Sequence, residues 1–269
     1  MQAAFQIKLH VKDTALLELI QRTLGVGNVY DLKDGFCRYM VTSIKDIKTA
    51  IIPHFDKYPL ITQKQADYTL FRTIILMVGN KEHLTMAGLQ KIISLRAAMN
   101  LGFSAALKSA FPNIVPALRP EVVNQKIQSP QWLAGFVSAE GCFFIDLKQK
   151  VAAAAGLDKS LSFRVLVFKI TQHSRDAELM KSIVTYLGCG TYYLDSRRNY
   201  GDFVVRRFAD LNSIIIPFFT KYPLQGSKAK DFSDFKDVVA IVQNKGHLTQ
   251  AGLEQMYQIK IGMNRGRIV

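Results

Sequence analysis

Hydrophobic and polar residues follow the same order in two places along the chain. Residues 5–10, FQIKLH, and residues 163–171, FRVLVFKIT, alternate or run apolar, as β-strands do. Each is followed by a residue suited to cap a helix, Asp13 or Asp176, and then by an amphipathic stretch that ends near a glycine. This pattern predicts a strand followed by a helix in both places.

In each of the two places, the sequence predicts two further short strands and three further helices after the first strand and helix. Helices starting near Ile44 and Phe208 run to a KYPL turn, and two further helices bracket the sequence NKxHLT. The resulting order is β-α-β-β-α-α-α, and the short connections imply antiparallel pairing. The predicted fold class is therefore α+β, present twice. The short strands are expected at residues 27–30 with 36–42, and at residues 190–194 with 202–206.

An internal repeat explains the double pattern. The aligned segments are 5–30 with 168–193, 51–60 with 215–224, and 78–89 with 242–253. The last pair agrees at 9 of 12 positions, far more than chance allows, so a whole domain is duplicated. Between the copies, four prolines and few large apolar side chains indicate a surface linker. We therefore expect domains at residues 1–110 and 131–269, joined by a linker at residues 111–130.

Composition narrows the class of partner. The chain of 269 residues is 49% hydrophobic, enough for a substantial core, and no apolar run approaches the roughly 18 residues that span a bilayer. A net charge of +14 attracts polyanions, of which nucleic acid is favoured over a membrane surface or an acidic protein. The three cysteines, Cys37, Cys142 and Cys189, match neither a disulfide framework nor a zinc pattern.

One segment of the second copy, WLAGFVSAEGCFFIDL at residues 132–147, has no counterpart in the first. Pro130 suits the first turn of a helix, and the residues after it favour helix continuation. The small residues along one side, which let another backbone approach closely, are Ala134, Gly135, Ser138 and Ala139. The large residues expected to pack into the domain are Trp132, Phe136 and Val137.

The predicted helix ends at an acidic residue, Glu140, where the chain passes into a predicted strand. Gly141 ends the helix and residues 142–150 predict a strand, so Glu140 stands where the chain enters a sheet. The segment resembles the signature helix of the LAGLIDADG homing endonucleases. The likeness extends to TQH, YLGCG, KYPL and NKxHLT, covers the whole chain, and is greatest to single-chain, two-motif enzymes of fungal mitochondrial introns.

The resemblance implies a fold, a reaction and a location. It implies two pseudo-symmetric domains, each a saddle-shaped antiparallel β-sheet backed by helices, and Mg2+-dependent cleavage of both strands at a long asymmetric site. By resemblance, Glu140 is a catalytic acid that binds the metal with the Ala139 carbonyl, and Gln172 and Arg207 surround the scissile phosphates. Intron mobility in the mitochondrion and a monomer bound to double-stranded DNA are also implied.

Strand alternation indicates which side chains of such a saddle face the major groove. Phe143 and Ile145 would point to the core. The groove-facing set in the second copy is Cys142, Phe144, Asp146, Lys148, Lys150, Lys169, Thr171, Thr191, Tyr193, Arg197, Arg198, Asp202, Val204 and Arg206. The set in the first copy is Gln2, Ala4, Gln6, Lys8, Asn28, Tyr30, Lys33, Arg38, Met40 and Thr42.

The first copy departs from the family pattern, because nothing in it corresponds to residues 131–163. A first signature helix and its acid are thus missing from this sequence. We weigh three explanations: the sequence is truncated at an internal Met, the gene has decayed, or the half motif acts in a dimer or with another fragment. Besides cleavage, the alternatives are an RNA maturase that assists splicing of intron RNA and a non-cleaving DNA-binding remnant.

Overall fold

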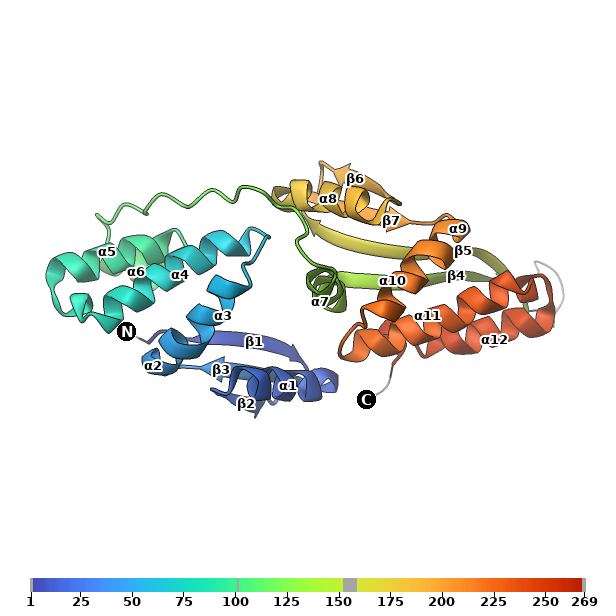
Figure 1. Ribbon diagram of the computed structural model, residues 1–269, viewed down its shortest axis with the longest axis horizontal. Helices are drawn as coiled ribbons and strands as arrows, with labels where there is room; N and C mark the ends of the chain where they lie inside the picture. Colours follow the sequence, from blue (N-terminus) through green and yellow to red (C-terminus); the bar gives the residue numbers. More distant parts are fainter. Residues whose placement is uncertain (1, 101, 152–158, 268–269) are drawn as a thin grey trace. The chain divides into compact units, whose positions relative to one another are not determined.

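The chain folds as two compact units, Met1–Gln125 and Lys126–Val269. The computed structural model describes residues 2–100, 102–151 and 159–267, without the side chains of residues 149–151, 159 and 160. Each unit combines an antiparallel sheet with helices (Figure 1), which confirms the predicted α+β class. No helix in the described part of the chain is long and apolar enough to cross a membrane.

The first unit has the predicted order of elements. Its strands are β1 (Phe5–His10), β2 (Asn28–Asp31) and β3 (Phe36–Val41), and they pair in the order β1-β3-β2. Its helices are α1 (Thr14–Leu24), α2 (Ile44–Asp46), α3 (Ile52–Lys57), α4 (Lys64–Gly79), α5 (Met86–Ala97) and α6 (Ala105–Ala110), with short turns η1 (Val11–Asp13), η2 (Ile47–Ile51) and η3 (Glu82–Leu84).

The second unit repeats this order after one extra helix and strand. Its strands are β4 (Gly141–Val151), β5 (Lys159–His173), β6 (Thr191–Asp195) and β7 (Tyr200–Val205), paired in the order β4-β5-β7-β6. Its helices are α7 (Pro130–Glu140), α8 (Ala177–Leu187), α9 (Phe208–Asp210), α10 (Ile216–Lys221), α11 (Ser227–Gln243) and α12 (Gln250–Ile261), with turns η4 (Ser174–Asp176), η5 (Leu211–Ile215), η6 (Gly246–Leu248) and η7 (Asn264–Gly266).

The residues that begin and end α1 also have counterparts at α8. Helices α1 and α8 both end at a glycine in the left-handed conformation, which a residue with a side chain rarely adopts. Asp13 and Asp176 do precede these helices, but neither side chain makes the expected capping hydrogen bond. The imidazoles of His10 and His173 accept backbone hydrogen bonds one turn earlier instead. The paired histidines therefore have turn-forming roles.

The predicted single helices that lead to the KYPL turns are interrupted in the same way. In each copy, a short α-helical turn passes into the π-helical turns η2 and η5 before α3 and α10 begin. Pro53 and Pro217 are the second residues of α3 and α10 and follow directly on these π-helical turns.

The larger core lies in the second unit, where aromatic rings meet between the sheet and the helices. Phe143 of β4 and Phe168 of β5 stack at 5.0 Å, and Phe143 also meets Phe235 of α11 at 5.2 Å. All three rings are fully buried. Because such rings each bury about 150–250 Å², this cluster fixes β4 firmly on the helical layer. The position of Glu140, one residue before β4, is fixed as a result.

Candidate active site and nucleic-acid interface

Helix α7 begins and ends for identifiable reasons. Ser129 caps it by accepting a 3.1 Å hydrogen bond from the Trp132 amide, and Pro130 occupies the first turn. The helix ends at Gly141, as predicted, but this glycine is extended and not left-handed. A side chain on Gly141 would start 2.6 Å from the Val137 carbonyl oxygen, so only glycine allows the chain to pass directly from α7 into β4.

One side of α7 is packed and the other is open within the described unit. Leu133 and Val137 are fully buried, and the rings of Trp132 and Phe136 stack at 5.0 Å beside them. By contrast, Gly135 is exposed, and a Cβ atom added to it would meet nothing within 4 Å among the described residues. Of the four small residues, Gly135 and Ala139 are exposed, whereas Ala134 is buried in the core of the unit and Ser138 is half-buried.

Ser138 ties α7 to the segment before α11. Its hydroxyl donates to the Ala134 carbonyl at 2.7 Å and accepts from the Gln225 amide at 2.9 Å. This contact joins residues 87 positions apart in the sequence. The last turn of α7 is therefore held from both sides, by β4 and by the start of α11.

Glu140 and Gln172 come together at the tip of α7. Burial raises the pKa of the Glu140 carboxyl, and a hydrogen bond with the Gln172 side chain lowers it in part. The side chain still reaches solvent. Gln172 stands near the end of β5, opposite Gly201 of β7. A carboxylate, an amide and the last carbonyl groups of α7 thus meet at one end of the sheet.

Arg207 is not part of this group. Strand β7 runs from its Gly201 end, beside Gln172, to Val205, which pairs with Phe168. Arg207 follows Val205 and therefore leaves the sheet at the other end of the strand. It forms an ion pair with Asp210, which raises the pKa of the Arg207 guanidinium. The structure does not bring it to Glu140 because the register of β7 carries it away.

In the first unit, strand alternation leaves polar side chains on one face, as predicted. The exposed residues include Gln6 and Lys8 of β1, and Arg38 of β3 is half-buried. Lys8 forms a 2.9 Å ion pair with Asp34 and lies 4.2 Å from the Phe36 ring. Gln2, Ala4, Asn28, Tyr30, Lys33 and Thr42 are exposed, and Met40 is half-buried.

In the second unit, the same rule holds with one correction. Val204 pairs with Lys169 and Thr191 and lies on the same face as they do, but it is only 4% exposed because these two neighbours flank it. Phe144 is 46% exposed while Phe143 and Ile145 are buried, as predicted. Cys142, Asp146, Lys169 and Asp202 are half-buried, and Lys148, Thr171, Thr191, Tyr193, Arg197, Arg198 and Arg206 are exposed.

Charge on this face is partly neutralised within the unit. Asp202 accepts a 2.5 Å hydrogen bond from Thr171 and lies 3.7 Å from the Lys169 amine. Arg197 and Arg198 extend from the turn between β6 and β7 and are 87% and 79% exposed. The predicted Lys150 lies outside the residues whose side chains are described. Both arginines lie within ion-pair distance of Asp195, at 3.5 and 3.6 Å, so charge at the turn is partly neutralised as well.

The sequence matches the LAGLIDADG endonuclease family over residues 1–75 and 133–239. The chain belongs to this family. Two Neurospora crassa proteins, "Probable intron-encoded endonuclease 3" and "Probable intron-encoded endonuclease 2", are 37% and 36% identical over 95% and 96% of the chain. The chain spans about half the length of these relatives, 47% and 57%.

Solved LAGLIDADG structures share the fold. I-SmaMI bound to cleaved DNA matches with a TM-score of 0.92 and 43% identity, covering 99% of this chain and 88% of that one. I-GzeII in complex with its DNA target matches with a TM-score of 0.89 and 41% identity, covering 99% and 90%. The fold is therefore that of the two-domain LAGLIDADG homing endonucleases.

Sequence reasoning missed one pair of polar clusters, on α4 and α11. Asp67 and Asp231 are 7% and 2% exposed, and each accepts a hydrogen bond from the backbone of a later asparagine and from an arginine. The two aspartates are 164 residues apart, which is the offset of the repeat. A comparison of charged residues between the two copies contained the signal that could have found them.

Proposed function

We propose that this protein is a site-specific DNA endonuclease that cuts a long, asymmetric duplex and promotes the mobility of its own intron in a fungal mitochondrion. The observation that carries the proposal is the position of Glu140, at the tip of a rigidly held helix and beside Gln172. Family membership and DNA-bound relatives of the same fold support it. The intron-encoded relatives of Neurospora crassa support the biological role.

The asymmetry of the site follows from the two open faces. The β1–β3 face presents Gln6, Lys8 and Arg38, while the β4–β5 face presents Phe144 and Lys148. Side-chain amides and guanidinium groups recognise base edges in the major groove, and phenylalanine contacts thymine methyl groups. Because the two faces differ in donors and apolar groups, each suits a different half-site sequence.

Magnesium is the metal we propose for the reaction, and this chain supplies only some of its ligands. The described residues hold no group of three His, Cys, Asp or Glu side chains that could bind one ion. The Glu140 carboxylate and the Ala139 carbonyl are oxygen donors, which magnesium prefers, and the negative end of the α7 dipole favours a cation there. DNA phosphate oxygens and a second acid complete such a shell. A bound magnesium ion would supply charge stabilisation to a phosphodiester.

Several residues around Glu140 position its carboxylate for the proposed reaction. The Gln172 side chain lies near the Glu140 carboxylate and partly lowers its pKa, so Gln172 can orient this carboxylate. Ser138 and Gly141 hold the helix end beneath it. Glu140 is open to solvent, so a cation can reach its carboxylate. Glu140 is thus the proposed catalytic residue, and Gln172 positions it.

The unpaired edge of β1 offers a position for a segment that carries a second acid. In the described part of the first unit, β1 pairs with β3 on one side and with no strand on the other, whereas β5 lies between β4 and β7. An unpaired strand edge accepts another strand readily. We propose that a helix and strand like α7–β4 occupy this edge in the active enzyme and bring the second carboxylate.

The test begins with a duplex selected by the wild-type protein from a randomised DNA pool. Wild-type protein, Glu140→Gln and the surface control Glu254→Gln are then incubated with this duplex and magnesium. We expect Glu140→Gln to lose at least about 100-fold in cleavage rate while its DNA affinity stays within about threefold, because the variant keeps the shape but loses the charge. Equal cleavage by wild type and Glu140→Gln refutes the catalytic assignment. Selection of no duplex refutes DNA recognition by this chain.

A further inference from the structure

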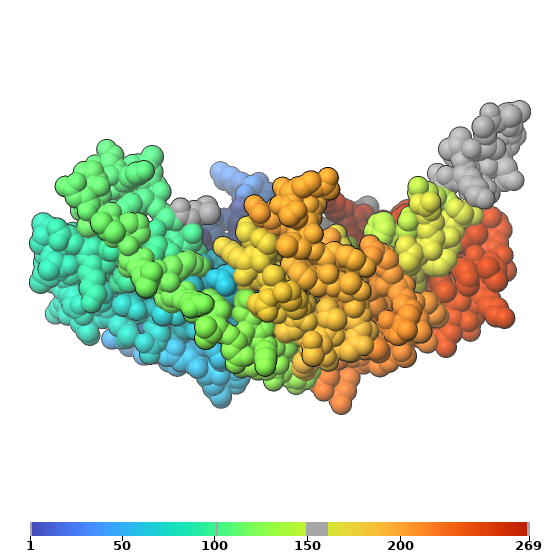
Figure 2. Space-filling model, turned by 90° about the horizontal axis from the view of Figure 1, so that it is seen from above, coloured from blue at the N-terminus to red at the C-terminus, as the bar shows by residue number. Residues whose placement is uncertain are grey.

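The segment between α6 and α7 is fastened to the first unit along most of its length. The Ala117 amide donates to the Ser94 carbonyl at 3.0 Å, and the Ser94 hydroxyl donates to the Val115 carbonyl at 2.6 Å. Residues 111–129, here called the linker, hold no helix or strand, and Figure 2 shows the green chain exposed on the surface. The linker therefore follows α5 through backbone contacts.

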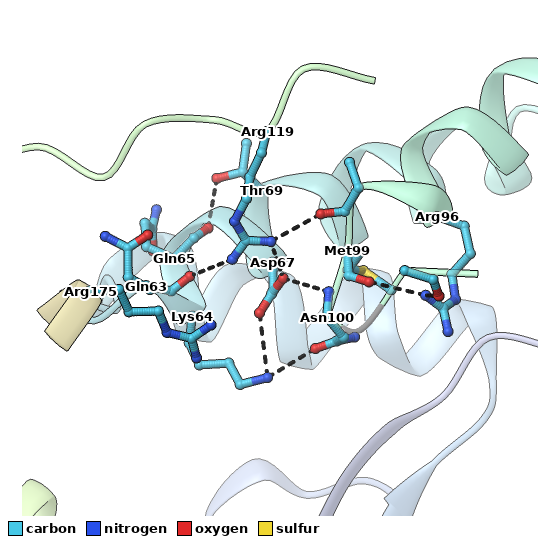
Figure 3. Close-up of polar contacts among 12 residues, drawn as sticks. Gln63, Lys64, Gln65, Asp67, Thr69, Arg96, Met99, Asn100, Arg119 and Arg175 are labelled. Carbon is cyan, nitrogen blue, oxygen red and sulfur yellow. Dashed lines mark hydrogen bonds and ion pairs between the residues drawn. The ribbon is translucent and has the colours of Figure 1, made fainter. Parts of the chain in front are cut away.

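Arg119 is the main anchor of the linker. Its guanidinium donates to the Asp67 carboxylate at 2.6 Å and to the carbonyl groups of Ala98 and Gln63, both at 3.0 Å (Figure 3). A planar guanidinium with three acceptors in fixed directions can occupy only one orientation. Asp67 is held in turn by the Asn100 amide at 2.8 Å. One linker side chain thus joins the start of α4 to the end of α5.

A second anchor follows six residues later. Gln125 is 7% exposed and donates to the Ile61 carbonyl at 3.0 Å, within the first unit. Ile127 packs instead against the core of the second unit. Only Lys126, which is exposed, separates these two anchors. The free tether between the units is therefore about one residue long, although the linker itself has 19 residues between α6 and α7.

The second unit forms the same cluster without a linker. Asp231, on α11, accepts hydrogen bonds from the Asn264 amide at 3.0 Å and from Arg267 at 2.9 Å. Arg267 follows the turn η7, shortly after α12, and its counterpart by the repeat is Phe103. In the first unit, the arginine comes from a position 16 residues further along, inside the linker. The cluster is thus repeated, but in the first unit it also fixes the path of the linker.

We propose that Arg119 is a positioning residue that fastens the linker to the first unit, leaves Lys126 as the hinge, and so restricts the spacing at which the two units can read their half-sites. The part that concerns DNA rests on the proposed function. Released from Arg119 and Gln125, residues 111–126 could extend to on the order of 50 Å, whereas one residue spans about 3.4 Å. A longer flexible tether lowers the effective concentration of the second unit at its half-site and admits other spacings.

The first experiment measures hydrogen exchange of linker amides in the full chain. It compares wild type with Arg119→Met, which keeps the alkyl chain, and with the matched control Arg267→Met, which removes the corresponding contact in the second unit. We expect exchange of residues 113–125 to accelerate at least about tenfold in Arg119→Met and to stay at the wild-type rate in Arg267→Met. Equal protection of the linker in wild type and Arg119→Met overturns the proposal.

The second experiment measures binding to the selected duplex with its native spacing and with two base pairs inserted between the half-sites. We expect the insertion to weaken wild-type and Arg267→Met binding by at least about 100-fold, and to weaken binding of the double variant Arg119→Met/Gln125→Ala, which releases both anchors, by less than about tenfold. An equal penalty in all three proteins overturns the positioning role. If wild type selects no duplex, the proposed function fails and the DNA-spacing role falls with it, while the exchange result still decides whether Arg119 fastens the linker.

Discussion

The two units share a sequence pattern, yet the same strand is buried in one and half exposed in the other. Phe168 and Ile170 of β5 are fully buried, whereas their counterparts in β1, Phe5 and Ile7, are only half-buried. The difference arises because β4 and α7 cover β5 in the second unit, and no described residues do so for β1. Local sequence therefore determines that a strand forms, but its burial depends on what packs beside it.

The largest effect we predict comes from removing the matched rings. Phe168→Ala should lower the free energy of unfolding of the second unit by about 3–5 kcal/mol, because a fully buried ring leaves a cavity. Phe5→Ala should cost the first unit about 1–2 kcal/mol, because its partly exposed ring loses less apolar burial. Urea unfolding of both variants, followed by hydrogen exchange for each unit, measures the two costs. Equal costs would show that β1 is covered as well as β5.

The next comparison concerns the buried aspartates. Asp67→Ala and Asp231→Ala should each lower the free energy of unfolding by about 1–3 kcal/mol, because each removes one acceptor of a partly buried arginine and the acceptor of a backbone amide. We expect the larger cost for Asp231, whose partner Arg267 is 19% exposed against 32% for Arg119. Denaturant midpoints at constant slope report the order. The reverse order would mean that exposure of the arginine does not determine the cost.

The sequence allowed the fold and the position of Glu140 at the end of a helix to be predicted, because both depend on local or repeated patterns. Periodicity and the repeat predicted the strands and the doubled α+β order, and the junction at Gly141 placed Glu140 at the tip of a helix. These successes share one property: the spacing in sequence determines the geometry. The position of Gln172 near Glu140 was not among these predictions, and its expected role at the scissile phosphates stays a prediction.

The failures involve contacts between distant segments. Val204 is buried because both neighbouring strands flank it, and alternation alone cannot show this. Arg207 was expected at the scissile phosphates, but the register of β7 places it at the opposite end of the strand. The contact of Arg119 with Asp67 spans 52 positions, and the linker composition gives no sign of it. Each of these features depends on tertiary pairing that a single sequence leaves undetermined.

Low pH should weaken the contact between Arg119 of the linker and Asp67. Burial raises the pKa of the Asp67 carboxyl, but the Arg119 and Asn100 hydrogen bonds outweigh it, and the net pKa lies below its ordinary value of 3.8. A lowered pKa in the folded state gives stability that is complete above pH 3.8 and is lost as the pH falls through the lowered value. The difference in thermal midpoint between wild type and Arg119→Met should therefore stay constant from about pH 8 to 5 and shrink below pH 3.8. A difference that is unchanged at pH 3 would contradict the pairing with ionised Asp67.

The smallest effect should come from the catalytic acid itself, which has no counterpart among the described residues of the first unit. Burial raises the pKa of Glu140 above its ordinary value of 4.5, so its negative charge opposes folding at neutral pH. Glu140→Gln should therefore raise the thermal midpoint at pH 8 by up to about 2 °C, a limit set by the partial exposure of the side chain. The gain should disappear at about pH 4, where wild-type Glu140 is protonated.

Differential scanning calorimetry at the two pH values, with Glu254→Gln as the exposed control, measures this effect. If the same substitution stabilises the fold and slows cleavage, the carboxylate has the properties expected of a cation ligand. A midpoint of Glu140→Gln below that of wild type at pH 8 would instead show that the carboxylate stabilises α7. The role of Glu140 would then be structural, like that of the aspartates on α4 and α11.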